Sequence, residues 1–287
     1  MTQPRLFCFG LGYSARRLAL RLIADGWQVA GTAREDDSVE ELKSLGIDAV
    51  LFHRNRPLED PQGALGGATH VLSSVPPDDV GDAVLDLHGD ILSKPFTWLG
   101  YLSTTGVYGN RDGGLVDEGS ALEPTSDRAR RRVAAEARWR DLGAHAFRLA
   151  GIYGPGRSVL DDVRAGRAKR IDKPNHVFSR IHVDDIGQVV RASMARPNPG
   201  AVYNVCDEAA AAPMDVVTYA CELLGVAPPA VQTFAAAEKE MSEMARTFWN
   251  DNKRVDNSRI KKELGVELLY PGYRQGLAAI LQEQLDG

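Results

Sequence analysis

The chain has 287 residues, of which 44% are hydrophobic and 25% are charged, a balance that is ordinary for a soluble globular protein able to bury a substantial core. Its formal net charge of −5 provides no basic surplus to neutralise phosphates, which argues against a general nucleic-acid binder. The three cysteines, Cys8, Cys206 and Cys221, lie far apart without C-x-x-C spacing, so they fit neither a disulfide framework nor a zinc site.

Short apolar runs alternate with amphipathic helical patterns through the first half of the chain. Residues 6–9 form the first strand-like run, and apolar residues then recur at helical spacing over 15–23. Further strand-like runs lie at 28–32, 49–52, 70–75, 96–102 and 146–149, and the main helical patterns at 80–92 and 127–142. Strands separated by such helices imply right-handed crossovers. We therefore predict an α/β fold with a doubly wound parallel sheet of the Rossmann type.

The alternation breaks after about residue 150. A Gly/Pro loop follows at 153–156, and later elements are expected at 184–194, 202–205 and 215–224. We expect an NAD(P)-binding Rossmann domain over residues 1–152, to which residues 178–208 return. Residues 153–177 and 209–287 are then expected to form a smaller C-terminal lobe that binds the substrate.

A glycine motif follows the first strand. The segment G-L-G-Y-S-A matches G-x-G-x-x-G/A and contains Gly10, Gly12, Tyr13, Ser14 and Ala15. The first glycine allows a tight turn, the second lets the backbone approach a pyrophosphate, and the small Ala15 lets helix and strand pack closely. The helix N-terminus attracts the anion. Because the motif stands between a strand and an amphipathic helix, it predicts a dinucleotide site; the alternative is an ordinary Gly-rich turn.

The end of the second strand indicates which dinucleotide binds. NAD sites usually place Asp or Glu about 20 residues beyond the glycines, whereas this strand ends in Thr32, Ala33 and Arg34. A guanidinium pairs well with a 2′-phosphate, and the Thr32 hydroxyl could add a contact. The sequence therefore favours NADP over NAD. The alternative is that Arg34 is a surface residue and the neighbouring Glu35 contacts the ribose.

Two further strand ends are candidates for the same site. Ser74, Val75 and Pro76 follow the fourth strand, where backbone commonly lines the cofactor, and a plain Pro-Pro turn is the alternative. Thr104 lies near the carboxyl end of the next strand, and ligands bind at that edge of open α/β sheets. We expect Thr104 to approach the nicotinamide or the substrate.

Four segments resemble one protein family in the order in which that family has them. Residues 102–109, L-S-T-T-G-V-Y-G, resemble its S-S/T-x-x-V-Y-G segment, and residues 148–157 its R-x-x-x-I-Y-G-P-G-R loop. Residues 181–185, I-H-V-D-D, and 202–205, V-Y-N-V, resemble a helix start and a strand. The family is the extended short-chain dehydrogenases/reductases, the NAD-dependent epimerase/dehydratase group. The resemblance implies a nicotinamide dinucleotide and a substrate crevice beside these segments.

The catalytic signature of that family is absent. Its members use Tyr-x-x-x-Lys on the helix after the S-x-x-V-Y-G segment, where the lysine lowers the tyrosine pKa and the tyrosine transfers the proton. Alignment on Glu136 puts Arg128 at the tyrosine position and Arg132 at the lysine position, and only Thr104 keeps a hydroxyl. Phe9 also stands where extended members carry the first of three glycines. Both departures resemble an atypical subgroup that keeps the dinucleotide site.

Several other residues are open to two interpretations. By resemblance, Tyr153 and Arg157 flank the substrate crevice, and Arg157 could recognise a phosphate or carboxylate or form a surface salt bridge. Tyr108 could supply a phenol or pack under its loop. Arg128 and Arg132 could bind an anionic substrate, although helix-surface arginines are the simpler interpretation.

The sequence predicts no metal site. His182, Asp184 and Asp185 lack a further convergent ligand, and we expect the two aspartates to cap and start the following helix.

Two functions remain open. The first is an NADP- or NAD-dependent oxidoreductase or epimerase-like enzyme with a non-standard active site, acting on a small polar or sugar-like substrate. The second is a non-catalytic NADP-binding sensor or regulatory protein. No signal peptide is visible, and no window approaches the roughly 18 apolar residues of a membrane span. We therefore expect a cytoplasmic protein without membrane or nucleic-acid partners, and the resemblance implies a homodimer.

Overall fold

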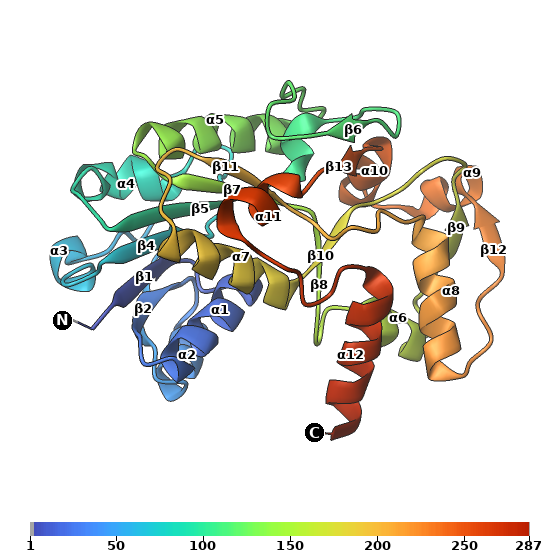
Figure 1. Ribbon diagram of the computed structural model, residues 1–287, viewed down its shortest axis with the longest axis horizontal. Coiled ribbons are helices and arrows are strands. Elements are labelled where there is room, and N and C mark those ends of the chain that lie inside the picture. The colour runs from blue at the N-terminus through green and yellow to red at the C-terminus, as the bar shows by residue number, and fades with distance from the viewer. Residues whose placement is uncertain (1–2, 287) are drawn as a thin grey trace.

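The computed structural model describes residues 3–286 and contains a central sheet of seven strands in the order β11-β7-β5-β4-β1-β2-β3. Every neighbouring pair in this sheet is parallel. Helices cover both faces of the sheet, so the predicted doubly wound α/β fold is confirmed (Figure 1). The strands are β1 (Arg5–Phe9), β2 (Gln28–Ala33), β3 (Asp48–Leu51), β4 (His70–Ser73), β5 (Trp98–Thr104), β7 (His145–Leu149) and β11 (Val202–Val205).

The two faces of the sheet carry separate hydrophobic cores. Along β1, Leu6 and Cys8 belong to one core, while Phe7 and Phe9 belong to the other, because successive side chains of a strand point to opposite faces. One core is covered by α1 (Tyr13–Ala24), α2 (Asp36–Ser44) and α7 (Val183–Ala195), and the other by α3 (Pro61–Ala64), α4 (Ala83–Leu92) and α5 (Asp127–Asp141). Burial on both faces explains why the strands read as nearly continuous apolar runs.

The strand order reverses direction at β1. From β1 the chain builds outward through β2 and β3, and then crosses to β4 on the other side of β1. The carboxyl ends of β1 and β4 therefore lie side by side where the two halves of the sheet diverge. Open α/β sheets bind their ligands in the crevice at such a reversal.

A smaller lobe follows β7 and has a core of its own. Its elements are β8 (Gly151–Tyr153), paired with β10 (Arg180–His182), and β9 (Arg170–Asp172), paired with β12 (Val231–Thr233), together with α6 (Val159–Arg164), α8 (Pro213–Leu224), α9 (Phe234–Ala237), η2 (Glu238–Glu240), α10 (Glu243–Asn250) and α12 (Tyr273–Asp286). Leu160, Ala220 and Leu277 bring α6, α8 and α12 together in this third core.

One C-terminal segment returns to the first domain. The strand β13 (Arg254–Val255) pairs with β6 (Leu115–Val116), and α11 (Ser258–Leu264) packs against β11 and α7. Val255, Ile260 and Leu264 join the core that β1 shares with α1. This placement differs from the predicted division, which put all of residues 209–287 in the smaller lobe, and it covers the edge strand β11. Within residues 3–286, no helix combines the length and apolarity needed to cross a membrane.

Candidate functional site

The glycine motif forms a tight turn between β1 and α1. Gly10 has φ +81°, and a Cβ atom there would stand 2.9 Å from Cγ2 of Val75. Gly12 is the N-cap residue of α1 and is exposed, and a Cβ atom at Gly12 would meet nothing within 4 Å. Gly10 is therefore required by the turn itself, whereas the space above Gly12 lies open in front of the first amides of a twelve-residue helix.

The predicted cofactor wall lies against this turn. The Ser74 amide donates to the Phe9 carbonyl at 2.8 Å, so the backbone after β4 continues alongside β1. Val75 then covers Gly10 with its side chain. Ser74 and Val75 are half-buried and Pro76 is exposed. The structure thus brings Ser74 and Val75 beside the glycines and puts Pro76 on the outside of the loop.

Tyr13, Ser14 and Ala15 open α1 and have different surroundings. Ser14 and Ala15 are buried, as close packing of the helix on the sheet requires. The Tyr13 hydroxyl donates to the Pro155 carbonyl at 2.9 Å, and the Arg157 guanidinium lies 5.5 Å from the centre of the Tyr13 ring. Tyr13 therefore joins the glycine turn to the Y-G-P-G-R loop.

Thr32 has a role that the sequence did not indicate. Its side chain is 1% exposed, and its hydroxyl accepts a hydrogen bond from the Gly10 amide at 2.9 Å. Its carbonyl accepts from the Leu11 amide at 2.8 Å. Thr32 therefore stabilises the glycine turn through two hydrogen bonds, and its buried hydroxyl does not face the open space in front of α1. Arg34 and Glu35, beyond the end of β2, are both exposed.

A cavity of about 440 Å³ lies beyond the carboxyl end of β5, between the sheet and the smaller lobe. It collects residues from five parts of the sequence, among them Thr104, Arg128, Arg132 and Tyr153. Thr104 was predicted as a site residue, Arg128 and Arg132 as replacements of the usual pair on one helix, and Tyr153 by resemblance. The Thr104 hydroxyl accepts a hydrogen bond from the Gly106 amide at 3.1 Å. Thr104 is half-buried and forms part of the cavity wall.

Arg132 is fixed by neutral partners. Its Nη1 donates to the Tyr101 hydroxyl at 3.0 Å and to the Leu102 carbonyl at 2.9 Å, and its guanidinium lies 5.5 Å from the centre of the Tyr101 ring. The expected lysine of the family is thus replaced by a guanidinium anchored to β5. A guanidinium stays protonated in proteins and cannot serve as the proton donor-acceptor.

Tyr108 does not face the cavity. It lies in the 3-10 helix η1 (Thr105–Tyr108), is 0% exposed, and donates to Asn204 Oδ1 at 2.6 Å. Arg148 donates to the Tyr108 hydroxyl at 2.8 Å. Burial raises the pKa of Tyr108 to about 12. Of the two interpretations of Tyr108, the structure matches packing under its loop, because the phenol is enclosed between β7 and β11 and lies outside the cavity lining, away from the proposed substrate.

Tyr153 and Arg157 separate in the structure. Tyr153 is buried, lines the cavity and donates to the Gly272 carbonyl at 3.5 Å. Burial raises the pKa of its phenol well above the ordinary value. Arg157 is exposed and lies over Tyr13, outside the cavity lining.

His182, Asp184 and Asp185 form structural contacts between elements. His182 is the N-cap residue of α7 and accepts from the Asp184 amide. Asp184 pairs with Arg17 at 2.8 Å and with Arg21 at 2.7 Å on α1. Burial lowers the pKa of His182 to about 4.

Asp185 accepts from the amides of Leu269 and Tyr270 at 2.6 and 3.2 Å. The two aspartates thus begin α7 as expected, but they connect it to other elements, and the cap is His182. Among the described residues, no group of three or more His, Cys, Asp or Glu side chains is arranged to hold a metal ion.

Two cationic residues of the cavity were missed by sequence reasoning. Lys253 and Arg180 both line it. Lys253 is 8% exposed and donates to the Gly109 carbonyl at 2.9 Å and to Asp251 at 3.2 Å. Neither residue belongs to a recognisable motif of its own, and only the return of residues 251–255 toward the sheet brings Lys253 to the site.

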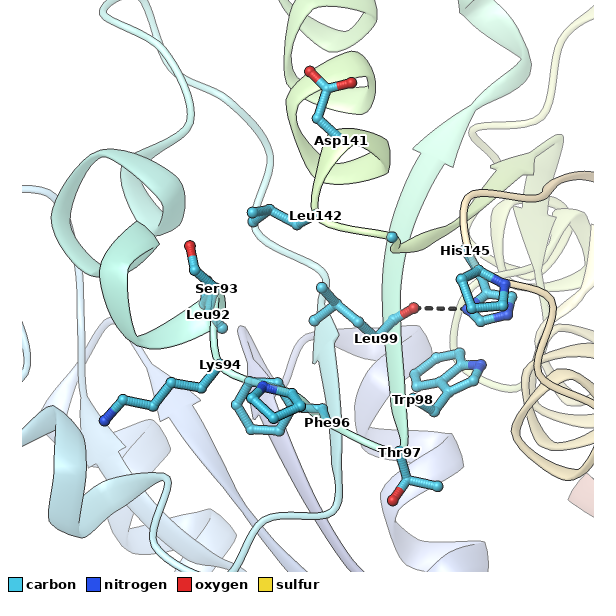
Figure 2. A pocket seen from close by; sticks show the side chains of 13 residues that line it. Leu92, Ser93, Lys94, Phe96, Thr97, Trp98, Leu99, Asp141, Leu142 and His145 are labelled. Carbon is cyan, nitrogen blue, oxygen red and sulfur yellow. Dashed lines mark hydrogen bonds between the residues drawn. The ribbon is translucent and has the colours of Figure 1, made fainter.

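A second cavity, of about 380 Å³, lies at the opposite edge of the sheet. Figure 2 shows its lining around the amino end of β5, including Trp98, Leu99 and Leu142. His145 Nδ1 lies 2.9 Å from the Leu99 carbonyl beside it. Since ligands of open α/β sheets bind at the carboxyl edge, the cavity at Thr104 is the candidate site.

Comparison with known proteins adds a family but no activity. No family model matches the chain. The Escherichia coli protein YeeZ is 29% identical over 275 residues, which are 91% of this chain and 94% of YeeZ. The solved structure of a functionally unknown conserved protein from Silicibacter pomeroyi DSS is 48% identical, has a TM-score of 0.89 and covers 98% of this chain and 99% of its own.

More distant solved structures share the fold. The dTDP-glucose 4,6-dehydratase of Bacillus anthracis in complex with NAD is 15% identical, with a TM-score of 0.79 and coverage of 99% of this chain and 97% of its own. The ADP-L-glycero-D-manno-heptose-6-epimerase of Helicobacter pylori is also 15% identical, with a TM-score of 0.78 and coverage of 98% and 96%. These distant structures show that the chain has the fold of NAD-dependent epimerases and dehydratases. At 48% identity over nearly the whole of both chains, it belongs to the same family as the functionally unknown conserved protein of Silicibacter pomeroyi.

Proposed function

We propose that the protein binds NADP(H) at the turn between β1 and α1 and acts as an oxidoreductase or epimerase-like enzyme with a non-standard active site. The observation that carries this proposal is the geometry of Gly12. Its exposed backbone opens onto free space at the N-terminus of α1, so a diphosphate can approach the amides closely. A structural neighbour with this fold was solved with NAD.

The preference for NADP rests on Arg34. This guanidinium is exposed just beyond β2 and, within residues 3–286, has no ion-pair partner, so it is free to pair with a 2′-phosphate. Glu35 is exposed as well and is the N-cap residue of α2. If Glu35 binds a ribose hydroxyl, NAD is favoured instead. Arg34 and Glu35 therefore favour different dinucleotides.

The substrate is proposed to occupy the cavity at Thr104. A bound nicotinamide supplies hydride transfer, while Thr104 supplies a hydroxyl at the wall. Arg128 and Arg132 replace the Tyr-x-x-x-Lys pair, which supports membership of the atypical subgroup of short-chain dehydrogenases/reductases. Proton transfer, if it occurs, must then use other groups, because these guanidinium groups do not release protons at working pH.

The alternative function is an NADP-binding sensor or regulatory protein without turnover. The anchoring of Arg132 to Tyr101 and Leu102 favours it, because this guanidinium has a structural role where the family has a catalytic lysine. In this case dinucleotide binding would be retained and hydride transfer would be absent.

One experiment separates the two functions. The protein is mixed with NADPH and a panel of carbonyl compounds and sugar nucleotides, and absorbance of the nicotinamide is followed. Consumption that disappears in Thr104→Ala, with NADPH affinity retained, supports the enzyme. Tight binding without consumption across the panel supports the sensor. No calorimetric heat with any oxidised or reduced dinucleotide would contradict both.

A further inference from the structure

The cavity at Thr104 is rich in positive charge. Among the residues that the structure describes, the lining holds one carboxylate, that of Asp251, and four cationic side chains, those of Arg128, Arg132, Arg180 and Lys253. Asp251 already accepts from Lys253 at 3.2 Å and from the Thr125 hydroxyl at 2.8 Å. The Asp251 carboxylate is therefore already paired with Lys253.

Hydrogen bonds fix the orientation of the Arg132 side chain, but no carboxylate among the described residues pairs with its charge. Its hydrogen-bond partners are the Tyr101 hydroxyl and the Leu102 carbonyl, both neutral. No carboxylate of the described chain lies within ion-pair distance of it, although it is half-buried. Both of these hydrogen bonds use Nη1, which leaves Nε and Nη2 as further donors of a side chain that lines the cavity.

Arg180, the first residue of β10, also lines the cavity and has neutral hydrogen-bond partners. Its Nη1 donates to the carbonyls of Phe178 and Ala211 at 2.9 and 3.1 Å, and it has no ion pair within residues 3–286. Burial lowers the pKa of Arg180, and the nearby Asp207 opposes this effect. Burial raises the pKa of Asp207 itself to about 7, so its negative charge is weakened near neutral pH.

Lys253 completes the cluster. It is the most enclosed of the cations in the cavity whose hydrogen bonds are given above, at 8% exposure, and burial lowers its pKa. Two of its three ammonium protons are directed to the Gly109 carbonyl and Asp251. Apolar residues such as Leu149, Ile152 and Val255 line the rest of the cavity. In such surroundings an unpaired charge is costly, and an ion pair is stronger than in water.

We infer that the substrate of this site carries an oxyanion group, a carboxylate or a phosphate, and that Arg132, Arg180 and Lys253 hold that group in the cavity. This inference rests on the proposed function in so far as the ligand is a substrate. Guanidinium groups offer paired donors that match the geometry of carboxylate and phosphate, and the lysine adds a compact charge. An oxyanion would balance the charges of Arg132 and Arg180, which have no acidic partner among the described residues, beside the Lys253–Asp251 ion pair.

The test measures binding of inorganic phosphate and of succinate to the full chain by calorimetry, with and without saturating NADPH, at constant ionic strength set by sodium chloride. Wild type is expected to bind at least one of the two anions in both states. Arg132→Met and Lys253→Met are each expected to weaken that binding on the order of tenfold or more, the loss typical of a charge-assisted hydrogen bond. Phosphate binding alone indicates a phosphorylated substrate, and succinate binding alone a carboxylic acid.

The matched control is Arg130→Met. Arg130 lies on the same helix α5 but is exposed, pairs with Asp127 and is absent from the cavity lining. Its affinity for the anions should equal that of wild type. The inference is overturned if folded wild type binds neither anion, or if Arg132→Met binds as wild type does.

Two further measurements separate loss of folding, loss of NADPH binding and loss of anion binding. Because Lys253 also supports Gly109, each variant is checked by its melting temperature, and Arg132→Met carries the test if Lys253→Met does not fold. NADPH binding is recorded separately by nicotinamide fluorescence. If folded wild type binds an anion but not NADPH, only the proposed function is contradicted. If it binds NADPH but neither anion, only the oxyanion site is overturned.

Discussion

The Arg148 guanidinium and the Glu136 carboxylate form an ion pair inside the protein, with Nη2 of Arg148 2.6 Å from Oε1 of Glu136 and side chains only 3% and 2% exposed. Ser103 donates to the other carboxylate oxygen at 2.6 Å, and Arg148 also donates to Tyr108. This network joins α5 to the carboxyl ends of β5 and β7. Through Ser103, the network fixes the carboxyl end of β5, which carries Thr104.

The first prediction concerns this ion pair. Replacing Glu136 by Gln leaves the Arg148 charge buried without its partner, so we expect the free energy of unfolding to fall by about 3–5 kcal/mol. Urea denaturation followed by circular dichroism measures it. Glu123→Gln is the matched control, because Glu123 pairs with Arg111 at the surface with 62% of its side chain exposed, and its effect should stay within about 0.5 kcal/mol. Equal losses in both variants would contradict the structural role of Glu136.

This network also shows how far sequence reasoning reached. Ser103, Tyr108 and Arg148 all lie in segments that were singled out by resemblance, and the fold that these segments imply is confirmed. The side chains of Ser103 and Arg148, however, contact Glu136 on α5, and that of Tyr108 contacts Arg148 and Asn204. A motif shows that a residue is tied to the fold, but its partners depend on how distant segments pack. The sequence left two interpretations of Tyr108 open for that reason.

The candidate site likewise contains residues that could be predicted from the sequence and residues that could not. The glycine turn, its neighbours Ser74 and Val75, and the position of Thr104 follow from local rules about strand ends and helix starts, and they could be predicted. Thr32 was expected to face the ligand because of its place at a strand end, but its hydroxyl accepts from Gly10. Lys253 and Arg180 reach the cavity through long-range packing of the smaller lobe, which leaves no periodic pattern in the sequence.

The second prediction separates the two glycines. Gly12→Ala should fold like wild type, because Gly12 has no neighbour within 4 Å of an added Cβ, yet it should weaken NADPH binding about tenfold or more by holding the diphosphate away from the helix amides. Gly10→Ala should instead lower the melting temperature, since Gly10 has φ +81° and its added Cβ would press on Val75. Unchanged affinity in a folded Gly12→Ala protein would place the diphosphate elsewhere.

The third prediction concerns the choice of dinucleotide. Arg34→Ala should weaken NADP binding by about 1.5–3 kcal/mol, as expected for the loss of a charge-assisted contact, and should leave NAD binding nearly unchanged. Calorimetric titration of both dinucleotides measures the difference. Glu35→Ala is the companion variant, because that side chain is exposed beside Arg34 and would contact the ribose in the alternative arrangement. If Arg34→Ala weakens both dinucleotides equally, the 2′-phosphate role is refuted, and selective loss of NAD binding in Glu35→Ala would support the alternative.

The last prediction concerns Asp207, which is 3% exposed and whose pKa is raised by burial to about 7. The folded protein holds this proton at pH values where the unfolded chain has released it, so the carboxyl favours folding at low pH and loses that advantage as pH rises from about 4 to about 7. Asp207→Asn removes the titration while keeping the shape. We therefore expect the unfolding free energy of Asp207→Asn, relative to that of wild type, to increase by on the order of 3 kcal/mol as pH rises from about 4 to about 7. Urea denaturation at several pH values gives the difference. Asp48→Asn, at a carboxylate that is 74% exposed, should show a flat difference over the same range. A flat difference for Asp207→Asn would mean that the carboxyl is ionised in the folded protein, and that a nearby negative charge opposes that of Arg180, which lines the cavity.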